Sequence, residues 1–206
     1  GRNVLNNLSF QASRGEIIAI AGVNGAGKST LARMLCGLQK NGSGTVLWAG
    51  KPMSRRLRRK KAYMVMQDVG HQLFTDSVAA ECALGIKTPN KVEIDRALEK
   101  VDLLAYKERH PLSLSGGQMQ RLAVVVSEIC GKELLVFDEP TSGLDLKSME
   151  EIGTLTRSLA TQGKVLLIIT HDIKFMMRIC TRILFIRDGE IVEDLSGGQK
   201  EKIVRL

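Results

Sequence analysis

Short apolar runs alternate along the chain with longer segments in which apolar residues recur at helical spacing. The runs are rich in β-branched residues, and their alternation with helical segments predicts an α/β fold with a mainly parallel sheet. We expect strands at 8–10, 16–20, 44–49, 62–66, 134–138, 165–170 and 183–186. We expect helices at about 29–38, 118–130, 146–162 and 172–180.

The stretch from about 76 to 104 has a different character. Its apolar residues fall at helical spacing and no strand pattern interrupts them (Ile94, Ala97, Leu98, Val101 and Leu104). We expect a helical subdomain, approximately 72–130, inserted into a single domain of residues 1–206. Near the end, Arg187–Glu190 reads RDGE, a hairpin turn signal.

Charge narrows the classes of partner. The 206 residues carry 30 Lys and Arg against 22 Asp and Glu, a net charge of +8 that suits nucleotides, nucleic acid or acidic lipid headgroups. Much of the excess lies in the run 55–61 (Arg55, Arg56, Arg58, Arg59, Lys60 and Lys61). Two interpretations stay open for this run: a solvated basic loop, or a patch for nucleic acid or lipid headgroups.

Membrane spans and cysteine sites are not expected. The apolar runs are far shorter than the roughly 20 residues that cross a bilayer. Four widely separated cysteines form no C-x-x-C pair (Cys36, Cys82, Cys130 and Cys180). We expect them to be buried free thiols in a reducing cytosol rather than disulfides or metal ligands.

A glycine-rich turn follows the strand expected at 16–20. Residues 22–30 read GVNGAGKST and match the spacing G-x-x-x-x-G-K-[ST] of a phosphate-binding loop. Glycines let successive N–H groups face phosphate oxygens, and the following helix adds the positive end of its dipole. Lys28 would reach the β- and γ-phosphates, and the Ser29 hydroxyl would reach Mg²⁺. The expected nucleotide-binding residues here are Asn24, Gly25, Ala26, Gly27, Lys28, Ser29 and Thr30.

Polar residues close three other predicted strands. Asp138 ends the apolar run at 134–138, on the ligand side of an α/β sheet, and is placed to hold Mg²⁺ directly or through water. The next residue, Glu139, can reach a water aligned on the γ-phosphate. His171 and Gln67 follow the strands at 165–170 and 62–66, so both are expected near the phosphate loop.

Residues 114–118 read LSGGQ. Together with the phosphate loop, Gln67, the strand ending at Glu139, the SGLD segment at 142–145 and His171, in this order, they make the chain resemble the ATP-binding cassette (ABC) ATPases. The resemblance covers nearly all 206 residues. It implies a P-loop NTPase core with a mainly parallel sheet, an amino-terminal antiparallel β portion and an inserted α-helical subdomain.

The resemblance also implies ATP hydrolysis with Mg²⁺ between two cassettes paired head to tail. The start of the helix after Ser115 would form an anion site over the ATP of a second ABC ATPase domain, in a homodimer or heterodimer. The residues implied at that interface are Ser115, Gly116, Gly117, Gln118 and Asp145. Glu139, His171 and Gln67 would be catalytic, and Ser29, Gln67 and Asp138 would be at Mg²⁺. A second LSGGQ at 195–199, which no magnesium strand follows, is interpreted as a coincidental turn and helix start.

The branch of the family is narrowed by length. Only 86 residues separate Lys28 from Ser115 (115 − 28 − 1), too few for the coiled-coil insertion of chromosome-structure relatives. A transporter ATPase is therefore favoured. The alternative is a non-transport ABC ATPase that acts on nucleic acid or ribosomes, for which the basic run 55–61 is the reason.

The segment Gln67–Glu81 reads QDVGHQLFTDSVAAE and resembles the same loop of energy-coupling-factor importers of vitamins or transition-metal ions. This resemblance implies a transmembrane coupling subunit in contact near Gln67–Glu81, and a peripheral location on the cytoplasmic face of the cell membrane. No nucleic acid is expected as partner. Leu73 and Phe74 would either anchor the membrane subunit or pack inside the helical subdomain.

The chain departs from the family at its beginning. ABC ATPases usually stack an aromatic residue on adenine, but no aromatic residue precedes Phe10. We therefore assign no adenine-stacking residue. Because the chain starts at Gly1 rather than Met, we expect a piece of a longer chain, such as a tandem of two cassettes.

Overall fold

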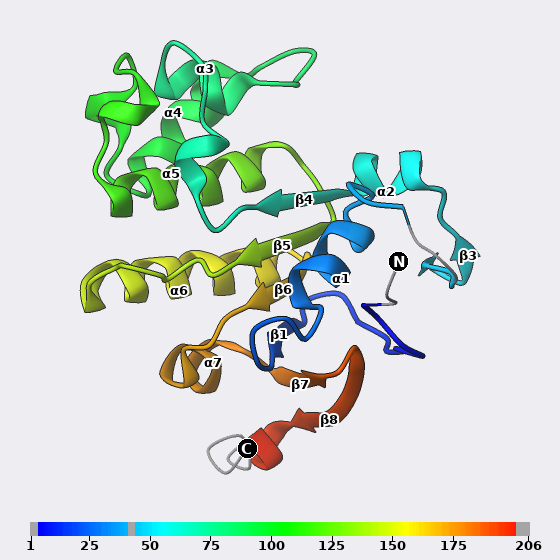
Figure 1. Ribbon diagram of the computed structural model, residues 1–206. Coiled ribbons are helices and arrows are strands. Elements are labelled where there is room, and N and C mark those ends of the chain that lie inside the picture. The colour runs from blue at the N-terminus through cyan, green and yellow to red at the C-terminus, as the bar shows by residue number, and fades with distance from the viewer. Residues whose placement is uncertain (1–3, 41–43, 201–206) are drawn as a thin grey trace.

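The structure is a computed structural model that describes residues 4–40 and 44–200. A six-stranded sheet crosses the molecule in the order β4-β5-β6-β1-β7-β8 (Figure 1). Its strands are β1 Ile17–Ala21, β4 Ala62–Val65, β5 Leu134–Asp138, β6 Val165–Ile169, β7 Arg182–Arg187 and β8 Glu190–Ser196. All neighbours are parallel except β7 and β8. The predicted α/β fold with a mainly parallel sheet is confirmed.

Helices cover both faces of the sheet. They are α1 Lys28–Leu35, α2 Arg55–Lys61, α3 Val78–Ala83, α4 Lys91–Glu99, α5 Gly116–Ile129, α6 Leu146–Thr161 and α7 Ile173–Ile179. In β1 the side chains alternate, as they must in a strand: Ile18 and Ile20 pack with α1, whereas Ile17 and Ala19 face the cluster that includes α5, α6 and α7. The central strands are therefore buried on both faces, which explains why they read as continuous apolar runs.

Helices α3, α4 and α5 pack around an apolar cluster of their own, above the sheet in Figure 1. Fully buried Leu98 from α4 and Leu122 from α5 belong to it. Short 3-10 helices connect these elements: η1 Val69–His71, η2 Leu104–Tyr106 and η3 Pro111–Ser113. The helices predicted from the apolar spacing between 76 and 104 thus form, as α3 and α4. None of the described helices is both long and apolar enough to cross a membrane.

Two expected strands come out differently. Residues 44–49 contribute only β2 Leu47–Trp48, which pairs antiparallel with β3 Lys51–Pro52 through a turn in which Ala49 and Gly50 both have positive φ. Residues 8–10 form no strand; Leu8 and Phe10 instead pack, half-buried, on the cluster beside α1. Among the described residues, the antiparallel β portion that the resemblance implied near the amino terminus is thus reduced to the β2–β3 hairpin.

The basic run 55–61 is the helix α2, not a loop. Ser54 caps its start by accepting a hydrogen bond from the Leu57 N–H at 3.2 Å. Arginine and lysine are good helix formers, and three of the six cations, Arg55, Arg59 and Lys61, bond to carbonyls or carboxylates of neighbouring segments. The run is therefore a helix that the sequence did not predict, in which Arg58 is buried while Arg56, Leu57, Arg59 and Lys60 are exposed.

The carboxyl-terminal hairpin forms as expected. Asp188 and Gly189, both with positive φ, make the turn between β7 and β8. The second LSGGQ begins inside β8, where Leu195 is buried, and the residues 197–200 form a 3-10 turn. The predicted turn is present, but Ser196 ends a strand rather than starting a helix.

Candidate functional site

The phosphate loop joins the end of β1 to the start of α1. Gly22 has φ 143°, and a Cβ there would lie 2.1 Å from the Ile186 carbonyl oxygen, so only glycine fits. Gly27 caps α1 with φ 102°. The Lys28 ammonium donates to the carbonyl oxygens of Gly22 at 2.7 Å and Val23 at 2.9 Å. The lysine is therefore held across the loop that it would help to line.

The predicted loop residues differ in exposure. Asn24 and Gly25 are exposed at the tip, whereas Ala26 and Gly27 are buried beneath it. The half-buried residues at the start of α1 are Lys28, Ser29 and Thr30. The first N–H groups of a helix have no intrahelical partner and carry partial positive charge, so this loop and helix start suit an anionic phosphate.

Asp138 lies at the carboxyl end of β5, beside the phosphate loop. Its side chain is buried, and burial raises the pKa of this carboxyl, while the Ser29 hydroxyl and the nearby cations Arg33 and Lys28 act in the opposite direction. A hydroxyl and a carboxylate are hard oxygen donors of the kind that Mg²⁺ prefers. No group of three or more His, Cys, Asp or Glu suited to a metal exists in the described part of the chain. Mg²⁺ at this pair would therefore need phosphate oxygens or water to complete its shell.

Glu139 and His171 come together from neighbouring strands. Glu139 follows β5 and its N–H donates to the Ile169 carbonyl of β6 at 2.8 Å. Its Oε1 lies 3.0 Å from Nδ1 of His171, which follows β6. The Glu139 side chain is 14% exposed and that of His171 is 80% exposed. Glu139 also has φ 51°, a backbone conformation that costs a non-glycine residue free energy and recurs at functional sites.

Gln67 lies at the same edge of the sheet, after β4, and is exposed. In the described chain it makes no hydrogen bond to Ser29 or Asp138. Its loop is instead fixed by Gln72, whose Nε2 donates to the Tyr63 hydroxyl at 3.0 Å and the Met64 carbonyl at 2.8 Å. Gln72 Oε1 also accepts from the Met66 N–H at 3.0 Å. The sequence pattern did not reveal this positioning role, because it depends on contacts between β4 and η1.

The LSGGQ segment at 114–118 forms the start of α5. Ser115 Oγ accepts from the Gln118 N–H at 3.4 Å, and Gln118 Oε1 accepts from the Ser115 N–H at 2.9 Å, a reciprocal cap. Ser115 and Gly116 are exposed, and a Cβ at Gly117 would lie 3.0 Å from Ser148 Oγ of α6. The capped helix starts at Gly116, two residues before the predicted start, with open backbone at its positive end.

Asp145 caps α6 beside this segment. Its Oδ1 accepts from the Ser148 N–H at 2.8 Å, and the hydrogen bonds from Ser148 lower the pKa of this carboxyl. The starts of α5 and α6 thus lie side by side. This places Asp145 and the Ser115 segment on one surface, as the resemblance implied for an interface.

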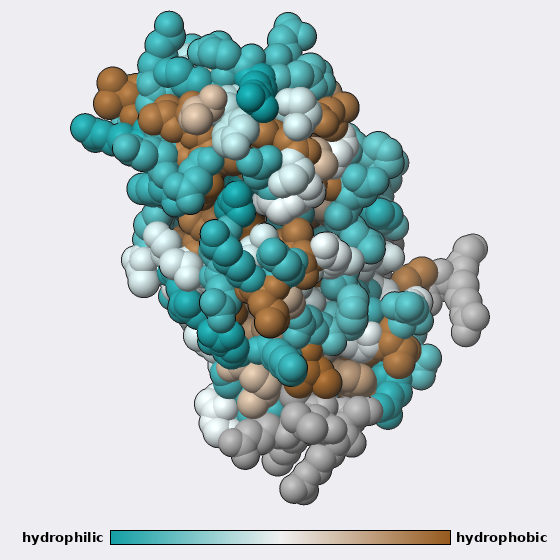
Figure 2. Space-filling view, turned by 90° about the vertical axis from the view of Figure 1, so that its left-hand side faces the viewer, coloured by the Kyte–Doolittle hydropathy of each residue, from teal (hydrophilic) through white to brown (hydrophobic). Residues whose placement is uncertain are grey.

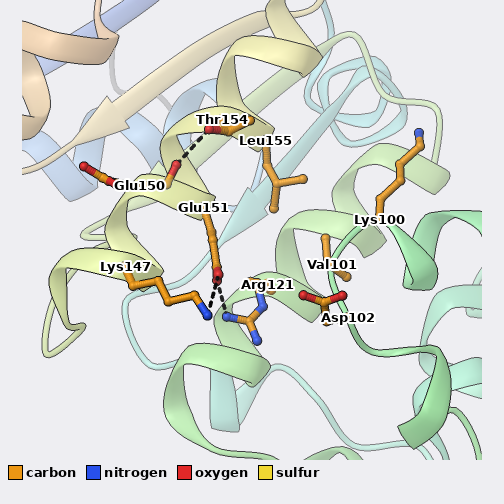
Figure 3. A pocket seen from close by; sticks show the side chains of 9 residues that line it. All are labelled: Lys100, Val101, Asp102, Arg121, Lys147, Glu150, Glu151, Thr154 and Leu155. Atoms are coloured by element: carbon orange, nitrogen blue, oxygen red, sulfur yellow. Dashed lines mark hydrogen bonds and ion pairs between the residues drawn. The ribbon is translucent and has the colours of Figure 1, made fainter.

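An ion-pair cluster ties α5 to α6 below these starts (Figure 3). Arg121 Nη1 lies 2.5 Å from Glu151 Oε2, and the Lys147 ammonium lies 3.9 Å from the other carboxylate oxygen. The cluster borders a cavity of about 330 Å³ that is also lined by Val101 and Asp102, which follow α4. None of these residues belongs to the phosphate loop, so this cavity is separate from the predicted nucleotide site.

The predicted site residues therefore fall into two groups. The first lies at the carboxyl ends of four parallel strands: Lys28, Ser29, Gln67, Asp138, Glu139 and His171. The second is at the starts of α5 and α6, and among the described residues no hydrogen bond or ion pair joins Ser115 or Asp145 to the phosphate loop. Figure 2 shows the side of the molecule toward which β4 and β5 point in Figure 1, where hydrophilic and apolar side chains both reach the surface.

The loop after Gln67 divides the two apolar residues that the sequence left open. Leu73 is 1% exposed and packs in the cluster of α3, α4 and α5, whereas Phe74 is 69% exposed. Buried Glu81 holds this loop: its Oε2 accepts from the N–H groups of Phe74 and Thr75 at 3.1 Å and from the Thr75 hydroxyl at 2.8 Å. Packing inside the helical subdomain is therefore confirmed for Leu73, whereas Phe74 faces outward.

The comparisons with known proteins agree with this geometry. The ABC transporter family matches residues 5–142. A protein of Treponema denticola assigned to the ABC transporter ATP-binding proteins is 57% identical over 201 residues, which are 98% of this chain and 41% of that protein. The chain thus spans less than half the length of that relative.

Solved structures match over nearly the whole chain. The Clostridium perfringens protein cbiO1, part of the ABC transporter complex cbiONQ, has a TM-score of 0.83 at 30% identity, over 98% of this chain and 84% of that one. The ATP-binding cassette MJ0796, solved as a dimer in a post-hydrolysis state with ADP and Pi, has a TM-score of 0.81 at 25% identity, over 94% and 90%. The chain belongs to the ABC transporter family and is an ABC ATPase domain.

Proposed function

We propose that this ATPase domain powers an importer of the energy-coupling-factor type, which carries a vitamin or a transition-metal ion. The observation that supports ATP-driven work is the convergence of Lys28, Asp138 and the Glu139–His171 pair at one sheet edge. The importer type rests on the Gln67–Glu81 segment and on the likeness to cbiO1, which belongs to the cbiONQ transporter complex. These observations concern the ATPase domain, and the transported substrate would be selected by another subunit.

Each residue at the edge has a proposed role. Lys28 and the N–H groups of residues 24–30 bind the phosphates, and the Ser29 hydroxyl and Asp138 carboxylate hold Mg²⁺, which would neutralise phosphate charge. Glu139 accepts a proton from the attacking water, and His171 orients the Glu139 carboxylate and contacts the γ-phosphate. Gln67 senses the γ-phosphate and Mg²⁺ from the loop that leads to α3.

The second group of residues is proposed to complete the site of a neighbouring domain. Ser115, Gly116, Gly117 and Gln118 present a helix start and a hydroxyl that suit a phosphate, yet they lie apart from this chain's own phosphate loop. A second ABC ATPase domain, identical or different, would place its ATP there, with Asp145 at the same interface. ATP then holds the two domains together and hydrolysis releases them, which gives two states that a partner can sense.

A transmembrane coupling subunit is proposed to dock near Gln67–Glu81, so that the domain works on the cytoplasmic face of the membrane. Exposed Phe74, on a loop held by Glu81, would supply an apolar anchor. We also propose that residues 1–206 are one cassette, with a helical subdomain at about 72–130, of a longer chain. The Treponema relative supports this proposal, because the match to this chain covers only 41% of that protein.

The alternative, action on nucleic acid or ribosomes, keeps only part of its support. The run 55–61 is a helix in which Arg55, Arg59 and Lys61 are engaged within the chain. Co-purification of the full-length polypeptide with a membrane subunit would support the importer. Tight, salt-dependent RNA or DNA binding that is lost when the run is neutralised would instead support the alternative.

The catalytic proposal is tested with Glu139→Gln. The amide keeps the shape of the carboxylate but cannot take the proton, so turnover should fall roughly 10²- to 10⁴-fold while ATP binding persists. The closed dimer should accumulate with ATP, as measured by gel filtration or light scattering. Glu99→Gln, at an exposed position of α4, is the matched control. Normal turnover in Glu139→Gln would exclude Glu139 as the proton acceptor.

A further inference from the structure

The carboxyl end of α1 is built to receive another element. The helix ends with Gly37 at φ 70°, and the Leu38 N–H returns to the Arg33 carbonyl at 2.8 Å while the Gly37 N–H bonds to the Met34 carbonyl at 3.0 Å. This arrangement is a Schellman cap. It leaves the carbonyl oxygens of Gly37 and Leu38 facing outward, where the negative end of the helix dipole adds to their charge.

Two arginines of α2 bind these carbonyls. Arg55 Nε donates to the Gly37 oxygen at 2.9 Å, and Arg55 Nη2 donates to the Leu38 oxygen at 3.0 Å. Arg59 Nε donates to the same Gly37 oxygen at 2.9 Å. A Cβ at Gly37 would lie 2.5 Å from the Arg55 carbonyl oxygen, so α2 approaches as closely as it does only because residue 37 is glycine.

The other end of α1 is the phosphate loop. The helix has eight residues, so about 12 Å separates the arginine contacts from Lys28. Helix α2 continues directly into β4, which leads to Gln67. Its last residue, Lys61, pairs with Glu133, the residue before β5, which ends at Asp138. Helix α2 thus connects the rear ends of the three elements whose front ends carry Lys28, Gln67 and Asp138.

The basic run contains a matched outward-facing pair. Arg56 and Lys60 are exposed, and their side chains make no hydrogen bond or ion pair with any residue of the ranges 4–40 and 44–200. The run therefore has two cations that bind the end of α1, half-buried Arg55 and exposed Arg59, and two that make no such contact. A surface for nucleic acid or lipid would depend on the outward pair, whereas a clamp on α1 depends on Arg55 and Arg59.

We propose that Arg55 and Arg59 are positioning residues for nucleotide binding, which fix the phosphate-binding helix by holding its carboxyl end. They act on the nucleotide through α1 and touch no phosphate themselves. The inference rests on the proposed role of Lys28 and the loop in binding ATP. It assigns the basic run an internal function in place of a partner surface.

The test compares two double variants that each remove two positive charges. Arg55→Gln/Arg59→Gln should weaken ATP binding roughly three- to thirtyfold, because the helix end loses its charge-assisted bonds and α1 is less well held. Arg56→Gln/Lys60→Gln should bind ATP as the unmodified domain does. The measurements are the Kd of ATP by titration calorimetry, and KM and kcat separately. We expect KM to rise while kcat changes by less than about threefold.

A general loss of folding must be distinguished from a loss of positioning. Thermal unfolding without nucleotide is therefore recorded for each variant. The single change Arg59→Lys is a milder variant, which keeps the positive charge and can still donate a hydrogen bond through its ammonium group. Partial recovery of ATP affinity in Arg59→Lys relative to Arg59→Gln supports positioning. Equal Kd values for the unmodified domain and Arg55→Gln/Arg59→Gln, or an equal loss in Arg56→Gln/Lys60→Gln, would overturn the inference. No ATP binding by the unmodified domain would instead refute the proposed function.

Discussion

Glu81 offers a sharp test of how the outward-facing loop is held. Its side chain is 2% exposed, and one carboxylate oxygen accepts from the Phe74 N–H, the Thr75 N–H and the Thr75 hydroxyl. In Glu81→Ala the hydroxyl keeps the Ser77 carbonyl, 3.0 Å away, as a partner, but the two N–H groups lose theirs. A buried donor without a partner costs about 1–3 kcal/mol. Some relaxation toward water follows, so we expect the free energy of unfolding to fall by about 2–4 kcal/mol.

Glu81→Gln should cost less. The amide oxygen still accepts hydrogen bonds but has lost the charge that strengthens them, so we expect a loss of about 1 kcal/mol. Glu99→Ala, an exposed change on α4, should alter the stability by no more than about 0.5 kcal/mol. Urea unfolding followed by circular dichroism gives these values, and amide hydrogen exchange at Phe74 and Thr75 reports the loop directly.

Two outcomes would refute this reasoning. The first is a Glu81→Ala variant as stable as Glu99→Ala, which would mean that the loop does not depend on the buried carboxylate. The second is a loss of stability with unchanged exchange at Phe74 and Thr75, which would place the effect elsewhere in the helical region. The first outcome would show that the hydrogen bonds of Glu81 do not stabilise the protein, and the second that they do not hold the loop.

Two further predictions concern serines and pH. Ser115→Ala should cripple ATPase activity, because Ser115 is the proposed contact of a second nucleotide, whereas Ser196→Ala at the end of β8 should leave it nearly intact; equal losses would contradict this. Arg182 donates to both carboxylate oxygens of Asp194 at 2.6 Å and lowers the pKa of that carboxyl. Asp194→Asn should therefore destabilise the protein by about 1 kcal/mol near pH 7, measured as a lower melting temperature. Because the folded-state pKa is lowered, the difference should shrink as the pH falls below 3.8, the ordinary value, and vanish once the carboxyl is protonated in the folded protein as well. A pH-independent difference would exclude this ion pair as the cause.

Much of the central sheet could be predicted from the sequence, because burial on both faces leaves a direct signal. The run at 134–138 is apolar until Asp138, and the observed strand has the predicted bounds. The phosphate loop could also be predicted, because Gly22 and Gly27 occupy positions where the backbone has positive φ. These features depend on local composition, which a single sequence contains.

The remaining features depend on contacts between distant segments. The helix at 55–61 was hidden because its cations suggested solvent, whereas Arg55 and Arg59 find carbonyl partners around residue 37. Residues 8–10 pair with none of the strands that the structure describes, and their apolar side chains pack on the core instead. Neither outcome can be derived from hydrophobic periodicity, because periodicity does not show which distant segment packs against a residue.

The same limit applies to the candidate site. The sequence named the residues that end the strands, and the structure brings Glu139 and His171 to 3.0 Å. The sequence did not single out Gln72 or Glu81 as residues that hold the loop after Gln67. Their roles come from hydrogen bonds to backbone groups, for which the residue type alone gives no signal. The catalytic and interface roles remain predictions for the experiments above.

The opposite environments of Leu73 and Phe74 have a consequence for how this loop can diverge among related chains. A substitution at Leu73 changes the packing of the surrounding core, so its effect on stability does not depend on the proteins with which the domain assembles. A change at Phe74 removes little packing within the fold, so in the proposed assembly the docking subunit would be its main constraint. Leu73 and Phe74 are therefore under different constraints, although they are adjacent. Substitution at Phe74 could adapt the domain to a different partner without changing the core.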